Sequence, residues 1–430
     1  MGTLRYGLID DAGHRVSGNI KPNTATMISP WTAVAILGVA SCGLPPLWGS
    51  EFLGGVAALS STDAWAVGHD DSKNKPLIKR WNGRSWTNEA EASGTDDCAL
   101  TAVSAIASND VWAVGSCGVS STSKHPHAQH WDGIRWTTVA VPITGGGGLL
   151  GVAAIGRTDV TAVGTKLTSG SPAPLVVRWN GTAWSEVNVP QPPGQGVLTG
   201  ITERNSSYWA AGYYSPQKGQ VHPLVLKGLA VEWRIETVPD AGSAGTWLSG
   251  IHAVSNSDIW AVGSNIRSAV IVHSDGTKWT VVPSPRAGTS EASLNALSGT
   301  VANDQWAVGQ IDSSEKTLIE HWDGHKWTVV ASPDTSVNGA NALNGVAVIS
   351  TTEAWAVGAI AVSGGSAIIE RWDGKKWSMV SAALEQAVKK SRSSVVTSRH
   401  SDSNCVGNLV GKSGELPGLG ELFCAANQKK

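Results

Sequence analysis

The stretch that decides the fold is EAWAVGAIAVSGGSAIIERWDGKKW, residues 353–377. It opens with a short apolar segment that ends in Trp-Ala-Val-Gly, and it closes with Trp-Asp-Gly-Lys-Lys-Trp. Asp-Gly between two apolar segments predicts a β-hairpin. The apolar runs on either side are too short for helices and predict strands.

Both markers recur along the chain and define a repeated unit of about 48 residues. The first marker, intact or altered, lies at Trp65, Trp112, Thr161, Trp209, Trp260, Trp306 and Trp355. The closing tryptophan of the second marker follows each one, at Trp86, Trp136, Trp184, Trp233, Trp279, Trp327 and Trp377. In the last unit we predict strands at residues 343–349, 354–357, 366–372 and 377–380. Seven such units predict an all-β fold, a seven-bladed β-propeller with four antiparallel strands per blade.

This pattern resembles bacterial seven-bladed propellers of the Kelch and galactose-oxidase-like type, in which a second strand ending in Gly is paired with a late Trp. The resemblance covers residues 52–380. The diglycine of Kelch second strands is missing, because each unit has a single Gly after Ala-Val. The hairpin is also similar to that of Asp-box propellers, whose full motif does not occur. The resemblance therefore implies the architecture and no particular activity.

The chain divides into an N-terminal segment at residues 1–50, the propeller at 51–382 and a largely disordered tail at 383–430. Residues 31–42, WTAVAILGVASC, allow two interpretations. Val39 to Cys42 is similar to the lipobox of bacterial lipoproteins, which would make Cys42 a lipid attachment site. Alternatively, the segment starting at Trp31 is the remnant fourth strand of a lost repeat.

The repeated residues are interpreted as structural. Of the 21 tryptophans, 18 occupy three positions of the repeat, as expected of rings that fill the space between blades. An acidic residue precedes the first marker in six units, and we expect it to hold the turn between strands one and two. We also expect the Ala-Val strands to run near the propeller axis, and blades one and seven to close the ring by packing.

Histidines and cysteines offer two further candidates. His125, His127 and His130 form the one histidine cluster and are weak candidates for metal ligands. No carboxylate or cysteine stands near them at a recognised spacing, so we expect no metal and no cofactor. Cys98 and Cys117 flank a predicted β-hairpin symmetrically, which predicts a disulfide and an oxidising compartment. The alternative is a pair of buried free thiols.

Composition limits the partners. The formal net charge is −2, which argues against nucleic acid and against an anionic membrane surface as the main partner. Contact with a membrane is then expected only through a lipid on Cys42. We expect a monomer that works outside the cell or on its surface.

The fourth unit departs most from the repeat, and irregular loops on a rigid scaffold are where binding residues gather. It carries Tyr213 and Tyr214, and Trp247 lies outside the three repeated tryptophan positions. With His222 and Asp240 as polar contacts, these aromatic residues form the candidate binding site. We expect a non-enzymatic module that binds a glycan or a protein on its loop face. The alternative is a secreted propeller enzyme of the lyase, hydrolase or oxidase type.

Overall fold

The computed structural model describes two strands near the N-terminus, residues 5–9 and 15–19, and residues 51–380 apart from 119–123, 230–231, 243–244, 267, 286–290, 312–315, 334–339 and 362–365. The chain divides into two compact units, Met1–Ala382 and Ala383–Lys430, and the second lies outside the described residues. The described residues form strands and turns and contain no helix. None of their segments is therefore a helix long and apolar enough to cross a membrane.

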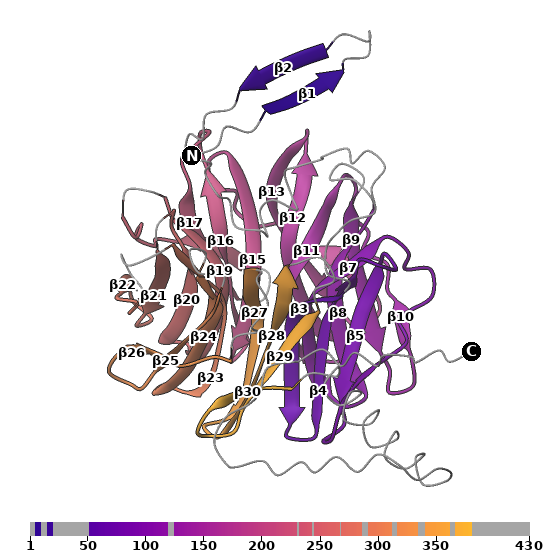
Figure 1. Ribbon diagram of the computed structural model, residues 1–430, viewed down its shortest axis with the longest axis vertical. Helices are drawn as coiled ribbons and strands as arrows, with labels where there is room; N and C mark the ends of the chain where they lie inside the picture. Colours follow the sequence, from indigo (N-terminus) through magenta and orange to yellow (C-terminus); the bar gives the residue numbers. More distant parts are fainter. Residues whose placement is uncertain are drawn as a thin grey trace, which may run out of the picture. The chain divides into compact units, whose positions relative to one another are not determined.

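Seven four-stranded antiparallel sheets form the propeller, each built from consecutive strands (Figure 1). The first four blades are β3 Glu51–Ser60, β4 Asp63–Asp70, β5 Lys75–Trp81 and β6 Trp86–Asn88; β7 Cys98–Ala107, β8 Asp110–Cys117, β9 His125–Trp131 and β10 Trp136–Thr138; β11 Gly147–Gly156, β12 Asp159–Thr168, β13 Ser171–Trp179 and β14 Trp184–Glu186; β15 Gln195–Arg204, β16 Ser207–Ser215, β17 His222–Leu229 and β18 Glu232–Glu236.

The last three blades repeat the same order. They are β19 Trp247–Ser255, β20 Asp258–Ser264, β21 Ala269–Ser274 and β22 Trp279–Val282; β23 Ala292–Val301, β24 Asp304–Ile311, β25 Lys316–Trp322 and β26 Trp327–Val329; β27 Ala340–Ser350, β28 Glu353–Ala361, β29 Ala367–Trp372 and β30 Trp377–Met379. A separate two-stranded sheet pairs β1 Arg5–Ile9 with β2 Arg15–Asn19. The predicted all-β, seven-bladed fold is confirmed.

The predicted hairpins between strands three and four form as expected. In the last blade, Trp372 pairs with Trp377, and Oδ1 of Asp373 accepts the backbone N–H groups of Lys375 and Lys376. Gly374 has a φ of +87°, which a side chain would disfavour. These hydrogen bonds also lower the pKa of Asp373, because they stabilise its charged form.

The innermost strand of each blade is its first strand, not the Ala-Val strand that we expected near the axis. The first strands of successive blades pack side by side in a closed ring, and the Ala-Val strands lie one position further out. Neighbouring backbones come so close that only small residues fit. A Cβ on Gly250 would lie 2.9 Å from the Cα of Ala296, and one on Gly345 would lie 3.2 Å from the Cα of Gly55.

Every first strand carries a β-bulge next to the residue that approaches the neighbouring blade. In blade 7 the bulge lies between Leu343 and Gly345. The bulged residue often reaches the next blade. Asn295 donates from Nδ2 to the carbonyl of Leu343 at 2.9 Å, and Thr199 donates from Oγ1 to the carbonyl of Leu248 at 2.8 Å. In these blades the bulge therefore aims a polar side chain at a backbone carbonyl of the adjacent first strand.

Tryptophans fill the space between blades, as predicted. Trp306 of blade 6 lies against Trp372 and Trp377 of blade 7, with ring centroids 4.8 and 5.3 Å apart, the latter pair edge to face. The same trio recurs around the ring, and the core clusters mostly combine residues from two adjacent blades. Of the tryptophans in the described part of the chain, fourteen are buried, namely Trp65, Trp81, Trp86, Trp112, Trp131, Trp136, Trp184, Trp209, Trp260, Trp279, Trp306, Trp327, Trp355 and Trp377.

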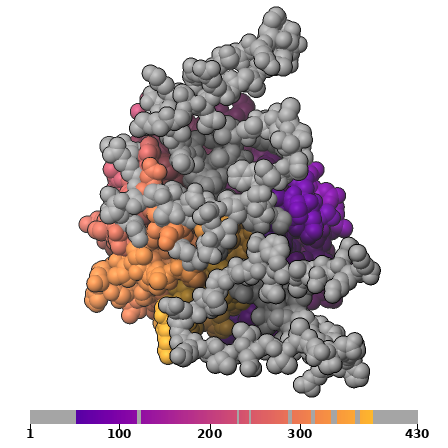
Figure 2. All heavy atoms as spheres, viewed as in Figure 1, coloured from indigo at the N-terminus to yellow at the C-terminus, as the bar shows by residue number. Residues whose placement is uncertain are grey.

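Blades 1 and 7 close the ring by packing, as predicted. The indigo β3 lies beside the gold β27 and β28 (Figure 1). Trp355 of blade 7 packs against Trp81 and Trp86 of blade 1, edge to face with Trp86, and Nδ2 of Asn344 donates to the carbonyl of Leu53 at 2.9 Å. In the space-filling view, the yellow atoms of blade 7 lie beside the orange atoms of blade 6 (Figure 2). The segment 31–39, considered above as a remnant strand, lies outside the described residues.

We predict that Asn344→Ala lowers the free energy of unfolding by roughly 1–2 kcal/mol, because it leaves the buried carbonyl of Leu53 without this donor. Urea unfolding followed by tryptophan fluorescence measures the change. The matched control is Asn303→Ala, at an exposed turn residue of blade 6, which should stay within about 0.5 kcal/mol of the parent protein. Equal effects of the two substitutions would contradict the role of Asn344 in closure.

A second prediction concerns His252 on β19. Burial lowers its pKa to about 4, although a backbone hydrogen bond with Gly299 of the next blade works in the opposite direction. The unfolded chain, with a histidine pKa near 6.5, then binds the proton more tightly than the folded protein. The free energy of unfolding should therefore fall as the pH drops from 6.5 towards 4.

The variant His252→Ser tests this, since serine occupies the equivalent position in blades 2 and 6, where Ser104 and Ser298 accept a backbone N–H of the next blade. The loss of stability between pH 7 and pH 4.5 should shrink by about 1–2 kcal/mol in the variant. An unchanged pH dependence would show that His252 titrates normally in the folded protein.

Candidate functional site

The repeated acidic residues pair across the sheet rather than within their turns, which corrects the expectation from sequence. Each lies at the start of a second strand and meets a basic residue of the third strand. Asp110 contacts Nε2 of His130 at 2.8 Å, and Asp159 contacts Arg178 at 2.8 Å. The other pairs are Asp63 with Arg80, Asp258 with His273, Asp304 with His321 and Glu353 with Arg371.

In five of these blades the basic group also covers the buried tryptophan of the second strand. The guanidinium carbon of Arg80 lies 4.6 Å from the Trp65 ring centroid, and the His321 ring lies 4.2 Å from that of Trp306. A cation or imidazole over an indole face is favourable, and the carboxylate fixes its position. These acid–base pairs thus belong to the scaffold, although a carboxylate beside a histidine is also a catalytic arrangement.

The fourth blade breaks this pattern. Ser207 stands where the other blades have an acid, and Lys227 covers Trp209 from 5.1 Å without a carboxylate partner at that position. Gly228 stands at the position where five other third strands have a tryptophan and blade 5 has Ser274, and the Trp233 ring lies 2.5 Å from where a Cβ on Gly228 would be. The hairpin nevertheless forms, since Leu229 pairs with Glu232. Blade 4 is therefore complete but carries different side chains.

Three of the predicted site residues meet at one end of this blade. Tyr214 pairs with His222 across β16 and β17, and their ring centroids are 5.2 Å apart. Nδ1 of His222 lies 2.8 Å from Oδ2 of Asp240, and the two side chains are 33% and 39% exposed. The cluster thus offers an aromatic surface, an imidazole and a carboxylate to solvent.

We expected Tyr213, Tyr214, His222 and Trp247 in loops, but all four lie in strands. Tyr213 is within β16, opposite Val197 and Pro223, and burial raises its pKa. Trp247 is the first residue of β19, the innermost strand of blade 5, and it is half-buried. The preceding residue, Thr246, donates its backbone N–H to the carbonyl of Val221, next to His222. Trp247 therefore lies at the same end of the blades as the cluster.

A cleft of about 250 Å³ adjoins Asp240. Its lining combines polar residues, among them Asp240, Asn265 and Ser268, with apolar residues, among them Val281, Val282 and Pro283. Asn265 holds the polar lining in shape, because its Nδ2 donates to the carbonyl of Ala241 at 2.8 Å and its Oδ1 accepts the N–H of Ser268 at 2.8 Å. The cleft joins blades 4 and 5 and extends the surface of the cluster.

A second cleft, of about 290 Å³, lies between blades 2 and 3. Its walls include the buried Asp110 and its half-buried partner His130, together with Arg157, whose Nε lies 3.4 Å from Asp110. Trp112 and Trp179 also line this cleft. Because the same acid–base pair occurs in blades 5 and 6, this cleft is built largely from scaffold residues.

The structure does not bring the three clustered histidines together. His130 contacts Asp110 and stacks on Trp112, whereas His127, three residues earlier on the strand, contacts the side-chain amide of Gln129 at 3.0 Å. His125 is exposed at the start of β9. Burial lowers the pKa of His127 to about 4, so its ring is neutral at pH 7.

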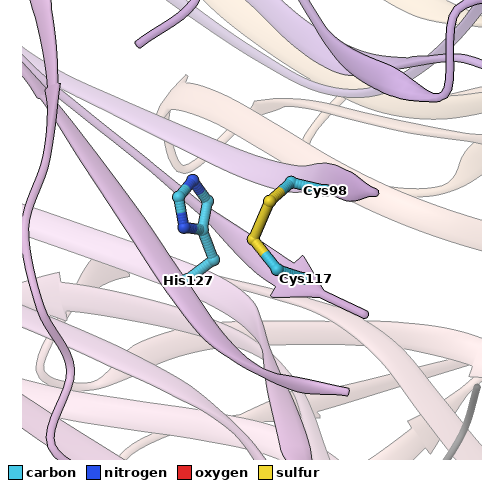
Figure 3. A group of neighbouring side chains, drawn as sticks. All are labelled: Cys98, Cys117 and His127. Atoms are coloured by element: carbon cyan, nitrogen blue, oxygen red, sulfur yellow. A yellow bond between two sulfur atoms is a disulfide. The ribbon is translucent and has the colours of Figure 1, made fainter. Parts of the chain in front are cut away.

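His127 lies instead beside two cysteines. Cys98 and Cys117 are directly opposite each other on β7 and β8, and a disulfide joins them with Cα atoms 4.0 Å apart (Figure 3). Sequence reasoning paired the two cysteines but missed His127 as their neighbour. Cys42 lies outside the described residues, so lipidation there stays a prediction.

Comparisons with known proteins bear on the fold. No family model matches the chain, and no curated protein matches it. Among solved structures, one titled "YCF48 bound to D1 peptide" is similar with a TM-score of 0.51 at 16% identity, covering 79% of this chain and 98% of that one. At this identity the likeness shows the propeller fold alone, and the Kelch-type assignment stays a prediction.

The disulfide leads to a prediction about stability. The serine substitutions Cys98→Ser and Cys117→Ser, made together, should lower the free energy of unfolding by roughly 2–3 kcal/mol, because the closed loop spans a sequence separation of 19 residues. Urea unfolding without a reducing agent measures this loss. A chemically reduced parent protein should match the double variant, and a parent protein that is insensitive to reduction would contradict the prediction.

Proposed function

We propose that this chain is a non-enzymatic protein-interaction module that binds an extended peptide at the ends of blades 4 and 5. The binding surface consists of Tyr213, Tyr214, His222, Asp240 and Trp247, together with the cleft beside Asp240. The single observation that carries the proposal is that these polar and aromatic groups depart from the repeat and are partly exposed. Elsewhere, the repeated acids and bases are committed to one another.

The chemistry of this surface suits a peptide. A half-exposed Tyr and Trp supply large apolar contacts at little entropic cost, as at many protein interfaces. The His222 and Asp240 side chains keep hydrogen-bonding capacity towards solvent and can meet a peptide amide or a basic side chain. The cleft, whose lining includes Val281, Val282 and Pro283, is large enough to take an apolar side chain of the peptide.

The solved propeller described above supports the choice of peptide over glycan, because its title records a bound peptide. The alternative function, a secreted propeller enzyme, would use the carboxylate–histidine pairs. Against it, the pair facing the cleft between blades 2 and 3 recurs in blades 5 and 6 as a support for a buried tryptophan. A group repeated at equivalent structural positions is better explained by the scaffold than by one active site.

We propose further that the protein works as a monomer outside the cell or on its surface. The disulfide between Cys98 and Cys117 supports the location outside the cell, because such bonds persist in oxidising compartments. A lipid on Cys42 would hold the propeller at a membrane. Alkylation of free thiols in protein taken directly from its native host tests the compartment, and a reduced pair there would contradict it.

The binding proposal is tested by selecting peptides from a displayed random library on the immobilised chain, with a glycan array probed in parallel. We predict a peptide consensus with a Kd in the micromolar range. Tyr214→Ala and Trp247→Ala should each weaken it by about tenfold or more, equivalent to roughly 1.4 kcal/mol or more.

The matched control is Phe52→Ala in blade 1, where Phe52 stacks on His69 with ring centroids 4.9 Å apart and His69 contacts Asp71. This trio resembles the cluster of blade 4 but lies in a different blade, so its loss should leave peptide affinity unchanged. Selection of glycans alone, or equal affinity in all variants, would contradict the proposed surface.

A further inference from the structure

The cluster of Cys98, Cys117 and His127 has no role in the proposed binding surface. The sulfur atoms of the two cysteines and a ring nitrogen of His127 all lie within 4.8 Å of one another. Among the described residues, no other group of three or more histidine, cysteine or acidic side chains gathers its ligand atoms this closely. The imidazole lies beside the sulfur pair in Figure 3.

These donors are the types that bind zinc. Thiolate sulfur and imidazole nitrogen are its preferred ligands, with bonds of about 2.3 Å to sulfur and 2.0–2.1 Å to nitrogen. A tetrahedral zinc then needs its two sulfurs roughly 3.7 Å apart. Cys98 and Cys117 face the same way from adjacent strands with Cα atoms 4.0 Å apart, so parallel side chains give nearly that spacing once the disulfide opens.

The surroundings already fit a metal ligand. His127 is 5% exposed, and Cys98 and Cys117 are 5% and 7% exposed, so the site is shielded from bulk water. The side-chain amide of Gln129 contacts Nε2 of His127 through its nitrogen at 3.0 Å, and its oxygen accepts the backbone N–H of Ala92, so the position of the ring is fixed. His125, the register partner of Cys117, is exposed and marks the edge through which an ion can enter.

We propose that reduction of the Cys98–Cys117 disulfide opens a zinc site whose protein ligands are Cys98, Cys117 and His127. A dithiol reductant supplies two electrons and two protons, which break the S–S bond and yield two thiols, while the dithiol itself becomes a disulfide. Zn²⁺ then replaces the two thiol protons. The ends of β7 and β8 are thus cross-linked in both redox states, by a covalent bond in one and by a metal in the other.

The test uses the full chain with Cys42, Cys405 and Cys424 replaced by serine, so that only the pair can supply sulfur. The protein is reduced without oxygen and titrated with Co²⁺, which reports thiolate ligands by a charge-transfer absorption in the near ultraviolet. We expect one Co²⁺ per chain in the reduced protein, loss of the band when Zn²⁺ is added, and no band in the oxidised protein.

Substitution of His127 distinguishes a site with three protein ligands from metal binding by the two thiolates alone. His127→Ala keeps both cysteines, and it should weaken Co²⁺ binding by about tenfold to a hundredfold, the range found for changes around metal ligands. The control His325→Ala, at an exposed hairpin residue of blade 6, should leave binding unchanged. No band in the reduced protein, a reduced chain that unfolds and takes up no Co²⁺, or equal affinity in His127→Ala would each overturn the proposal.

Discussion

The close approach of seven first strands around the axis is the constraint on which the rest of the structure depends. Where each strand bulges, the second strand presses against it. A Cβ on the final glycine of each Trp-Ala-Val-Gly marker would lie within about 2 Å of the carbonyl oxygen opposite, as at Gly358 against Ala342. The repeated glycine is therefore a requirement of the bulge. The bulge in turn aims a polar side chain such as Asn344 at the neighbouring blade.

Packing further from the axis follows from this geometry. Blades that are held together at their inner edges diverge outwards, and the widening gap must be filled by large side chains. Two or three tryptophans per unit fill it, and in five blades the third strand contributes an arginine or histidine that covers one indole face. The acidic residue that begins the second strand forms an ion pair with this basic group and so balances its charge. One inner constraint thus accounts for the glycine, the tryptophans and the acid–base pairs.

Sequence alone predicts the parts of this scheme that depend on local chemistry. Asp373-Gly374 specifies its hairpin through its own side chain and backbone, so blade number and strand order follow from counting such pairs. The partner of Asp110 could not be inferred in the same way, because His130 is 20 residues away and other blades use arginine there. The order of strands about the axis was also predicted wrongly, since both first and second strands are apolar and only the bulge distinguishes them.

The candidate site shows the same contrast between features that follow from local sequence and contacts that depend on distant strands. Tyr214, His222 and Asp240 stand out in the sequence because they interrupt a repeat, and the structure brings them together. His127 could not be linked to Cys98 from spacing, since their contact depends on three strands in register. Yet alternation along a strand already separates His127 from His130, which lie an odd number of residues apart and so point to opposite faces. In a propeller, then, candidate functional side chains can be recognised in the sequence where the repeat is interrupted. The residues that contact them become apparent only from the structure, because strand register brings together residues from different strands.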